Sequence, residues 1–163
     1  MRETIEARVF ALSRSHDLLN ANDWRSAGLH DIVDAALEPF VVSNGGVKRI
    51  VIAGENIDMA PKVTTALSIA LHELATNAVK YGALSNEKGS VSIAWALEGD
   101  DLKLRWQEKN GPPVSPPSRR GFGSQVIERG LALELQSTVN LDYLKDGVVC
   151  RISIPAKGAS IAQ

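Results

Sequence analysis

The chain begins with apolar residues that recur at helical spacing. Residues 2–20 repeat an apolar position every three or four residues, which predicts a helix with one apolar face. The repeating positions are Ile5, Val9, Leu12, His16 and Leu19. A second helix is expected from about Ser26 to Glu38, and Pro39 is its expected stop because proline interrupts helical hydrogen bonding.

The longest helical pattern runs from Lys62 to Tyr81. It follows Pro61, a residue that is tolerated at the first helical position, and Gly82 is expected to close it. The expected buried face consists of Leu67, Leu71, Leu74 and Ala78. One more helix is expected from about Ser124 to Leu135.

Alternating and β-branched runs predict five strands. These strands cover residues 49–54, 90–97, 102–108, 138–144 and 148–154. Hairpin turns are expected at Gly99-Asp100-Asp101 and at Lys145-Asp146-Gly147. The order of elements predicts an α+β fold of two layers, in which helices cover one face of a mixed sheet and an N-terminal helix comes first.

Composition and charge narrow the possible functions. The 163 residues suit one domain, and a hydrophobic content of 44% is enough for a core. The net charge of −1 indicates no nucleic-acid-binding surface. No apolar run reaches the ~20 residues of a transmembrane helix, and the N-terminus has no signal-peptide core. We therefore expect a cytoplasmic domain without membrane contact.

Polar residues interrupt the apolar pattern of the longest helix. Glu73, Asn77 and Lys80 stand at i, i+4 and i+7 and so share one face. The amide oxygen of Asn77 suits Mg²⁺, Glu73 could deprotonate or orient a nucleophile, and Lys80 could meet phosphate. Spacing alone also fits a solvated polar face with an ordinary ion pair. Zinc is excluded, because Thr76 stands where a second histidine would have to follow His72.

Two later segments add an acid and several glycines. Glu108 ends a strand before Gly111-Pro112, where its carboxylate could accept a hydrogen bond from an exocyclic amine such as that of adenine. The glycine would let a planar base approach the backbone. Gly121 and Gly123 precede an expected helix, whose N-terminal N–H groups could hold phosphate. A G-x-G pattern by itself is more often a simple turn.

Taken in order, these segments resemble the HWE sensor histidine kinases, a subfamily with the Bergerat ATP-binding fold that DNA gyrase also has. The subfamily is named for a histidine in the asparagine-bearing helix and for a W-x-E motif. The matching segments are His72-Glu73-Leu74-Ala75-Thr76-Asn77-Ala78, Lys80-Tyr81-Gly82-Ala83-Leu84-Ser85, Trp106-Gln107-Glu108, Gly111-Pro112 and Gly121-Phe122-Gly123-Ser124. The resemblance covers essentially the whole chain.

The resemblance implies an ATP site with roles for residues of the longest helix. Asn77 would coordinate a Mg²⁺ ion bound to the phosphates of ATP. Glu73 would be the general base or the organiser of phosphoryl transfer, with His72 beside it. Lys80 would touch phosphate, and Tyr81 would help to line the nucleotide pocket.

The resemblance also implies a base-binding end and a lid. Glu108 would stand where relatives place the aspartate that reads the adenine amino group, and Gly111 beside Pro112 would permit approach to the base. Residues 109–123 would be the ATP lid. Its phosphate-binding end would comprise Gly121, Phe122, Gly123 and Ser124. Many relatives have a threonine near the adenine, whereas this chain has Val148-Val149-Cys150 in that region.

The implied organisation places a piece of a second domain before the catalytic one. Residues 1–22 would end a dimerisation and phosphotransfer helix, residues 23–156 would form the ATP-binding domain and residues 157–163 a tail. The phosphorylated histidine would lie on an upstream helix, because His16 falls on the apolar stripe of residues 2–20 and fits packing better. We therefore expect no autophosphorylation by this chain alone.

The implied partners are a response regulator, which would receive the phosphoryl group on an aspartate, and the sensor and phosphoacceptor domains of the full-length protein. The full-length protein would be a homodimer. Two alternatives remain open. One is a nucleotide-binding pseudokinase that acts through protein contacts, and the other is a related ATPase or serine kinase of the same fold.

Overall fold

The computed structural model describes residues 27–43, 49–113 and 137–155. Five strands of this part form one sheet in the order β2-β4-β5-β7-β6. They are β2 (Ile50–Ala53), β4 (Ser90–Glu98), β5 (Asp101–Lys109), β6 (Thr138–Leu144) and β7 (Gly147–Pro155). Strand β2 is parallel to β4, and the other neighbours are antiparallel, so the sheet is mixed as predicted.

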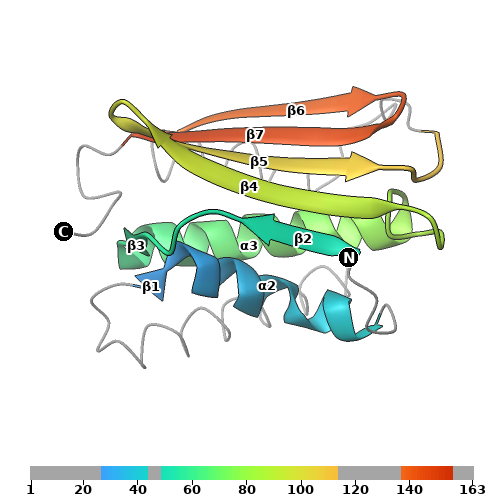
Figure 1. Cartoon of the computed structure of the whole chain (residues 1–163), viewed down its shortest axis with the longest axis horizontal. Helices are drawn as coiled ribbons and strands as arrows, with labels where there is room; N and C mark the ends of the chain where they lie inside the picture. Colours follow the sequence, from blue (N-terminus) through green and yellow to red (C-terminus); the bar gives the residue numbers. More distant parts are fainter. Residues whose placement is uncertain (1–26, 44–48, 114–136, 156–163) are drawn as a thin grey trace.

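Two helices cover one face of this sheet (Figure 1). They are α2 (Leu29–Ser43) and α3 (Pro61–Lys80), which pack against each other. The two-layer α+β architecture is therefore confirmed. A small antiparallel pair of two-residue strands, β1 (Ala27–Gly28) and β3 (Asp58–Met59), was not predicted. The predicted helices over residues 2–20 and 124–135 lie outside the described residues.

The prediction that α2 stops at Pro39 is wrong, because the helix continues to Ser43 with the proline inside it. Proline lacks the N–H that a helix interior uses, and its ring crowds the preceding turn. A tertiary contact explains why the last turn still forms. Phe40 packs edge-on against His72 of α3, with ring centroids 5.2 Å apart. Packing between helices thus outweighs the local preference of one residue.

The beginning of α2 is capped by a residue from another segment. The side-chain oxygen of Asn56 accepts hydrogen bonds from the backbone N–H groups of His30 at 2.9 Å and Asp31 at 3.4 Å. The amide nitrogen of Asn56 donates to the carboxylate of Asp31 at 3.2 Å. A β-carbon at Gly28 would overlap with this asparagine. The cap therefore ties α2 to the loop between β2 and β3.

Helix α3 begins as predicted, with Pro61 in its first turn, and ends at Lys80. Gly82 does not close it through a left-handed conformation, since its φ is not among the positive values of the described glycines. A β-carbon at Gly82 would instead overlap with a carboxylate oxygen of Glu108. The glycine is needed here because the end of α3 and the end of β5 approach closely.

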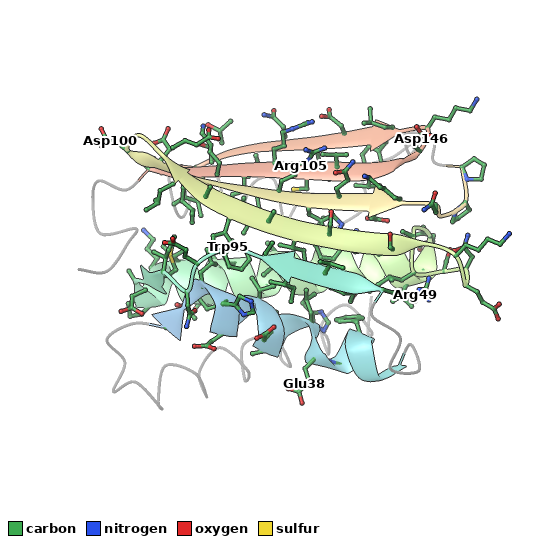
Figure 2. All side chains as sticks on the ribbon, viewed as in Figure 1. Glu38, Arg49, Trp95, Asp100, Arg105 and Asp146 are labelled. Atoms are coloured by element: carbon green, nitrogen blue, oxygen red, sulfur yellow. The ribbon has the colours of Figure 1, made fainter. Side chains whose placement is uncertain are left out.

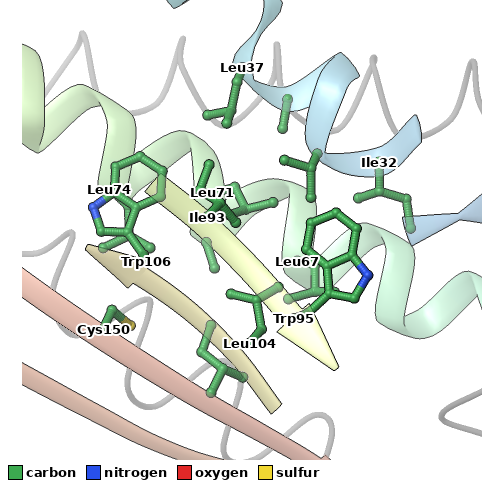
Figure 3. Packing of buried hydrophobic residues seen from close by; sticks show 14 of the residues in the cluster. Ile32, Leu37, Leu67, Leu71, Leu74, Ile93, Trp95, Leu104, Trp106 and Cys150 are labelled. Atoms are coloured by element: carbon green, nitrogen blue, oxygen red, sulfur yellow. The ribbon is translucent and has the colours of Figure 1, made fainter. Parts of the chain in front are cut away.

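The core lies between the inner face of the sheet and the two helices (Figure 3). The predicted buried face of α3 is confirmed, since Leu67, Leu71, Leu74 and Ala78 are all at most 2% exposed. Trp106 of β5 is fully buried and faces these leucines. The alternating burial of β4 and β5 leaves polar residues and alanines on the opposite face of the sheet. Chemistry that needs α3 must therefore take place at the helical layer or at the ends of the sheet.

Candidate functional site

The polar face predicted on α3 changes from buried to exposed towards the end of the helix. Glu73 is 5% exposed, Asn77 one turn later is half-buried, and Lys80 is exposed. Tyr81 follows directly and is 73% exposed. A buried carboxylate, an amide and an ammonium group therefore follow one another along one flank, in the order that the spacing predicted. A wholly solvated face would not bury Glu73.

His72 does not join this group. Successive helical residues differ by about 100° in direction, which separates the side chain of His72 from that of Glu73. His72 is 8% exposed, contacts Phe40 of α2, and has its Nδ1 3.5 Å from the hydroxyl of Thr76. Burial lowers the pKa of the imidazole, which favours the neutral form. These contacts describe a histidine packed between helices, and none of them supports the catalytic role predicted for it.

The W-x-E motif forms a hydrogen-bonded staple across the fold. The indole N–H of Trp106 donates to Oε2 of Glu108 at 3.0 Å. The other carboxylate oxygen, Oε1, accepts the backbone N–H of Ala83 at 2.9 Å. Glu108 is only 3% exposed. The motif therefore connects the end of β5 to the residues that follow α3, a connection between positions 25 residues apart.

Burial also affects the protonation of this carboxyl group. It raises the pKa of Glu108 above its usual range, while the hydrogen bonds from Ala83 and Trp106 lower it in part. Both donors prefer the ionised carboxylate, so the staple is strongest when Glu108 is charged. The predicted role of Glu108 as the acceptor of an adenine amino group stays a prediction, and its two oxygens already have partners within the chain.

Gly111, in the loop after β5, packs against Ala83, the residue whose N–H group Glu108 accepts. A β-carbon at Gly111 would lie 2.6 Å from the Cα of Ala83, a distance that no side chain could tolerate without a shift. Gly111 and Pro112 are both half-buried. The structure thus brings together the end of α3, the residues after it and the loop after β5. Gly121, Phe122, Gly123 and Ser124 lie outside the described residues.

Sequence reasoning missed one functional candidate, Arg49. Its guanidinium donates to the carbonyl oxygens of Gly89 and Ala83, each at 2.9 Å, and to that of Asn86. Figure 2 places Arg49 at the start of β2, at the same end of the molecule as Asp146 in the β6–β7 turn. In the sequence, Arg49 is simply a cationic residue before an apolar strand, and such a residue is usually exposed to solvent.

A hollow of about 640 Å³ lies elsewhere, on the outer face of the sheet. Ala94 and Ala96 are among its lining residues, together with Arg105 and Arg151. Arg151 pairs with Asp142 at 3.0 Å. Because α3 covers the opposite face, this hollow does not belong to the site of Glu73 and Asn77.

The described residues contain no group of three or more His, Cys, Asp or Glu side chains that could hold a metal ion. The amide oxygen of Asn77 is of the kind that Mg²⁺ accepts as a ligand, together with phosphate oxygens and water. No helix in the described part is long and apolar enough to cross a membrane.

The proteins that are similar to this chain in sequence are histidine kinases. A family model described as HWE histidine kinase matches residues 1–56. The blue-light-activated histidine kinase of Brucella ovis is 41% identical over 152 residues, which are 91% of this chain and 31% of that protein. The protein of the same name from Brucella anthropi is 40% identical over 157 residues, 94% of this chain and 32% of its own length. The chain thus spans about a third of the length of these relatives.

Solved structures show the same fold at low sequence identity. The histidine kinase domain of the Erythrobacter litoralis EL346 blue-light-activated histidine kinase has a TM-score of 0.77 and 15% identity, over 97% of this chain and 82% of that one. The catalytic domain of histidine kinase ThkA has a TM-score of 0.59 and 15% identity, over 80% and 95%. The chain belongs to the HWE histidine kinases, and its described part has the fold of a histidine kinase catalytic domain.

Proposed function

We propose that this chain binds Mg²⁺-ATP at the flank of α3 and transfers the γ-phosphoryl group to a histidine of a sensor kinase. The observation that carries the proposal is the buried carboxylate of Glu73 beside Asn77, on a helix of a histidine kinase fold. Acids are seldom buried, and a buried carboxylate on a polar flank is typical of a functional site. Its place next to an oxygen ligand suits a reaction centre.

The residues fit the chemistry of phosphoryl transfer. Such reactions depend on positioning and on stabilisation of charge more than on covalent catalysis. Asn77 would hold Mg²⁺ through its amide oxygen, and the ion would neutralise charge on the ATP phosphates. Lys80, exposed at the end of α3, would meet phosphate as a cation, and the exposed Tyr81 would cover the nucleotide. Glu73 would orient the attacking imidazole or accept its proton.

The base would lie towards Gly111 and Pro112. A planar ring can approach a glycine backbone closely, and Gly111 already packs against Ala83 without a side chain. Glu108 would contribute here either through a shared carboxylate oxygen or through the backbone that it holds in place. The glycines at 121 and 123 would bind phosphate within the proposed lid over residues 109–123.

The acceptor and the partners follow from the family. The phosphoryl acceptor would be a histidine on a dimerisation helix, with residues 1–22 as the end of that domain. Residues 23–156 would be the catalytic domain, in a protein that forms a homodimer. A response regulator in the cytoplasm would then receive the phosphoryl group on an aspartate. The relatives carry this chain's counterpart as about a third of their length, which supports a multidomain protein.

Nucleotide binding can be tested at Asn77. We expect a non-hydrolysable ATP analogue to bind in the presence of Mg²⁺, and we expect the Asn77→Ala variant to lose the Mg²⁺-dependent part of that affinity. Calorimetric titration with and without Mg²⁺ measures this difference. Asn140→Ala is a matched control, because Asn140 is exposed on the outer face of the sheet. Equal affinities of the Asn77→Ala variant and the wild type would exclude the assigned role.

The pseudokinase alternative is tested by phosphoryl transfer in trans. The chain is mixed with labelled ATP and a histidine-bearing segment of a full-length relative. We expect label on histidine, and we expect Glu73→Gln to bind nucleotide but to transfer about 10²–10⁴-fold more slowly. Binding without transfer by the wild type would favour the pseudokinase. Label on serine would favour a serine kinase of the same fold.

A further inference from the structure

The residues between α3 and β4 form a compact turn, residues 82–89, which we name the post-helix turn. The N–H groups of Gly82 and Leu84 each donate to the carbonyl oxygen of Ala78 at 3.0 Å, so the turn is hydrogen-bonded to the last turn of α3. Its far end is closed by Asn86, whose side-chain oxygen accepts the N–H of Gly89 at 2.8 Å. Any displacement of this turn would therefore displace the end of α3.

Arg49 holds this turn from the side of β2. Its side-chain N–H groups donate to the backbone carbonyls of Ala83 near the start of the turn, Asn86 in the middle and Gly89 at the end. A guanidinium group offers five N–H donors in a fixed plane, so it can hold carbonyls that face it from different directions. A lysine at this position would keep the charge but would lose that planar fork. Arg49 also accepts, through its backbone carbonyl, the N–H of Val91 at 2.8 Å.

Glu108 and Gly111 hold the turn from the other side. Oε1 of Glu108 accepts the N–H of Ala83, while the guanidinium of Arg49 binds the carbonyl oxygen of the same residue. Gly111 packs on the Cα of Ala83. One peptide segment is thus fixed by an anion, a cation and a close backbone contact, which come from three separate strands or loops.

We propose that Arg49 is a positioning residue of the nucleotide site, which it serves by clamping the post-helix turn. The turn joins Lys80 and Tyr81, at the phosphate side, to Gly111, at the side proposed for the base. This inference rests on the proposed nucleotide-binding function. Arg49 itself does not contact the nucleotide in this proposal. It limits the positions that the two sides of the site can adopt relative to each other.

The test compares Arg49→Lys and Arg49→Met with the wild type. Arg105→Lys is the matched control, because Arg105 is an exposed arginine in the sheet (Figure 2). Two quantities are measured, at a temperature at which circular dichroism shows that every variant is folded. They are the Kd for a non-hydrolysable ATP analogue with Mg²⁺ and the hydrogen exchange of the amides in residues 82–89.

We expect both Arg49 variants to exchange the amides of the post-helix turn faster and to bind the analogue more weakly. If the lysine variant holds the turn in place about a tenth of the time, its Kd rises about tenfold. The Arg105→Lys control should match the wild type in both measurements. If Arg49→Met fails to fold, the lysine variant decides the question.

Two results would overturn the proposal. Unchanged exchange in the lysine variant would show that Arg49 does not clamp the turn. Faster exchange with an unchanged Kd would show that the clamp is structural only, because it would not position the nucleotide site. Failure of the wild type to bind the analogue is a different outcome. It would refute the proposed function, and with it the positioning role, whatever the exchange of the turn.

Discussion

At the scale of single residues, neighbours in the sequence have different environments. His72 lies against Phe40 in the helix interface, while Glu73 starts the flank that leads to Asn77. The spacing of Glu73, Asn77 and Lys80 predicted their common face correctly, because a helix has a fixed angle per residue. No spacing rule could predict that Phe40 would cover His72, since the two residues are brought together only by the packing of α2 on α3.

The burial of His72 predicts a pH dependence of stability. Its pKa is lowered in the folded state, so the unfolded chain takes up a proton first as the pH falls below about 6.5. The contribution of the neutral imidazole is therefore complete above that pH and is lost as the pH falls towards the folded pKa. We expect the free energy of unfolding to fall less steeply in His72→Gln than in the wild type. Urea unfolding between about pH 8 and pH 5.5 measures both slopes, and parallel slopes would contradict the expectation.

The staple between Trp106, Glu108 and Ala83 predicts coupled mutations. A glutamine at position 108 can accept only one of the two N–H groups that Glu108 accepts, so Glu108→Gln should destabilise the fold by about 1–3 kcal/mol. Trp106→Phe removes one of the two donors. We therefore expect Glu108→Gln to cost less in that background, with a coupling energy of at least about 0.5 kcal/mol. A double-mutant cycle by urea denaturation measures it, and strict additivity would argue against the staple.

At the scale of secondary-structure elements, the two ends of helix α2 depend on residues far away in the sequence. Helix α2 takes its N-terminal cap from Asn56, 26 residues after His30, and its last turn passes through Pro39 because Phe40 packs on α3. The ends of the five strands of the sheet were predicted within one residue. Alternation of buried and exposed positions, as in β4, β5 and β6, has few other interpretations. Strands β1 and β3 were missed because two residues cannot show a period.

The cap of α2 makes a prediction at this scale. Asn56→Ala removes the acceptor of the His30 and Asp31 N–H groups and should destabilise the domain by about 1 kcal/mol. Asn56→Asp retains an acceptor oxygen and should recover part of this loss, although its charge faces that of Asp31. Thermal unfolding of both variants measures the effect. Equal stability of Asn56→Ala and the wild type would mean that solvent replaces the cap without cost.

At the scale of the whole molecule, one end of the sheet carries the candidate site. The last turn of α3, the end of β5 and the start of β2 meet there, as Figure 1 shows for the described residues. The outer face of the sheet, with Arg105 and Arg151, is separated from the site by the core. In the described residues, the end of α3 and the loop with Gly111 meet through Ala83, and this is where we propose the nucleotide site.

The helical and strand patterns, the α+β class, the polar flank of α3 and the family can all be inferred from the sequence. These properties depend on periodicity and on ordered motifs, which a linear chain already displays. Three contacts could be seen only in the folded molecule. His72 packs in a helix interface, Trp106 and Glu108 form a staple, and Arg49 donates hydrogen bonds to the post-helix turn. Each of these depends on contacts between residues 25 to 40 positions apart or on burial between layers, which arise only when the chain folds. Periodicity describes which face a residue occupies, and only packing determines what that face meets.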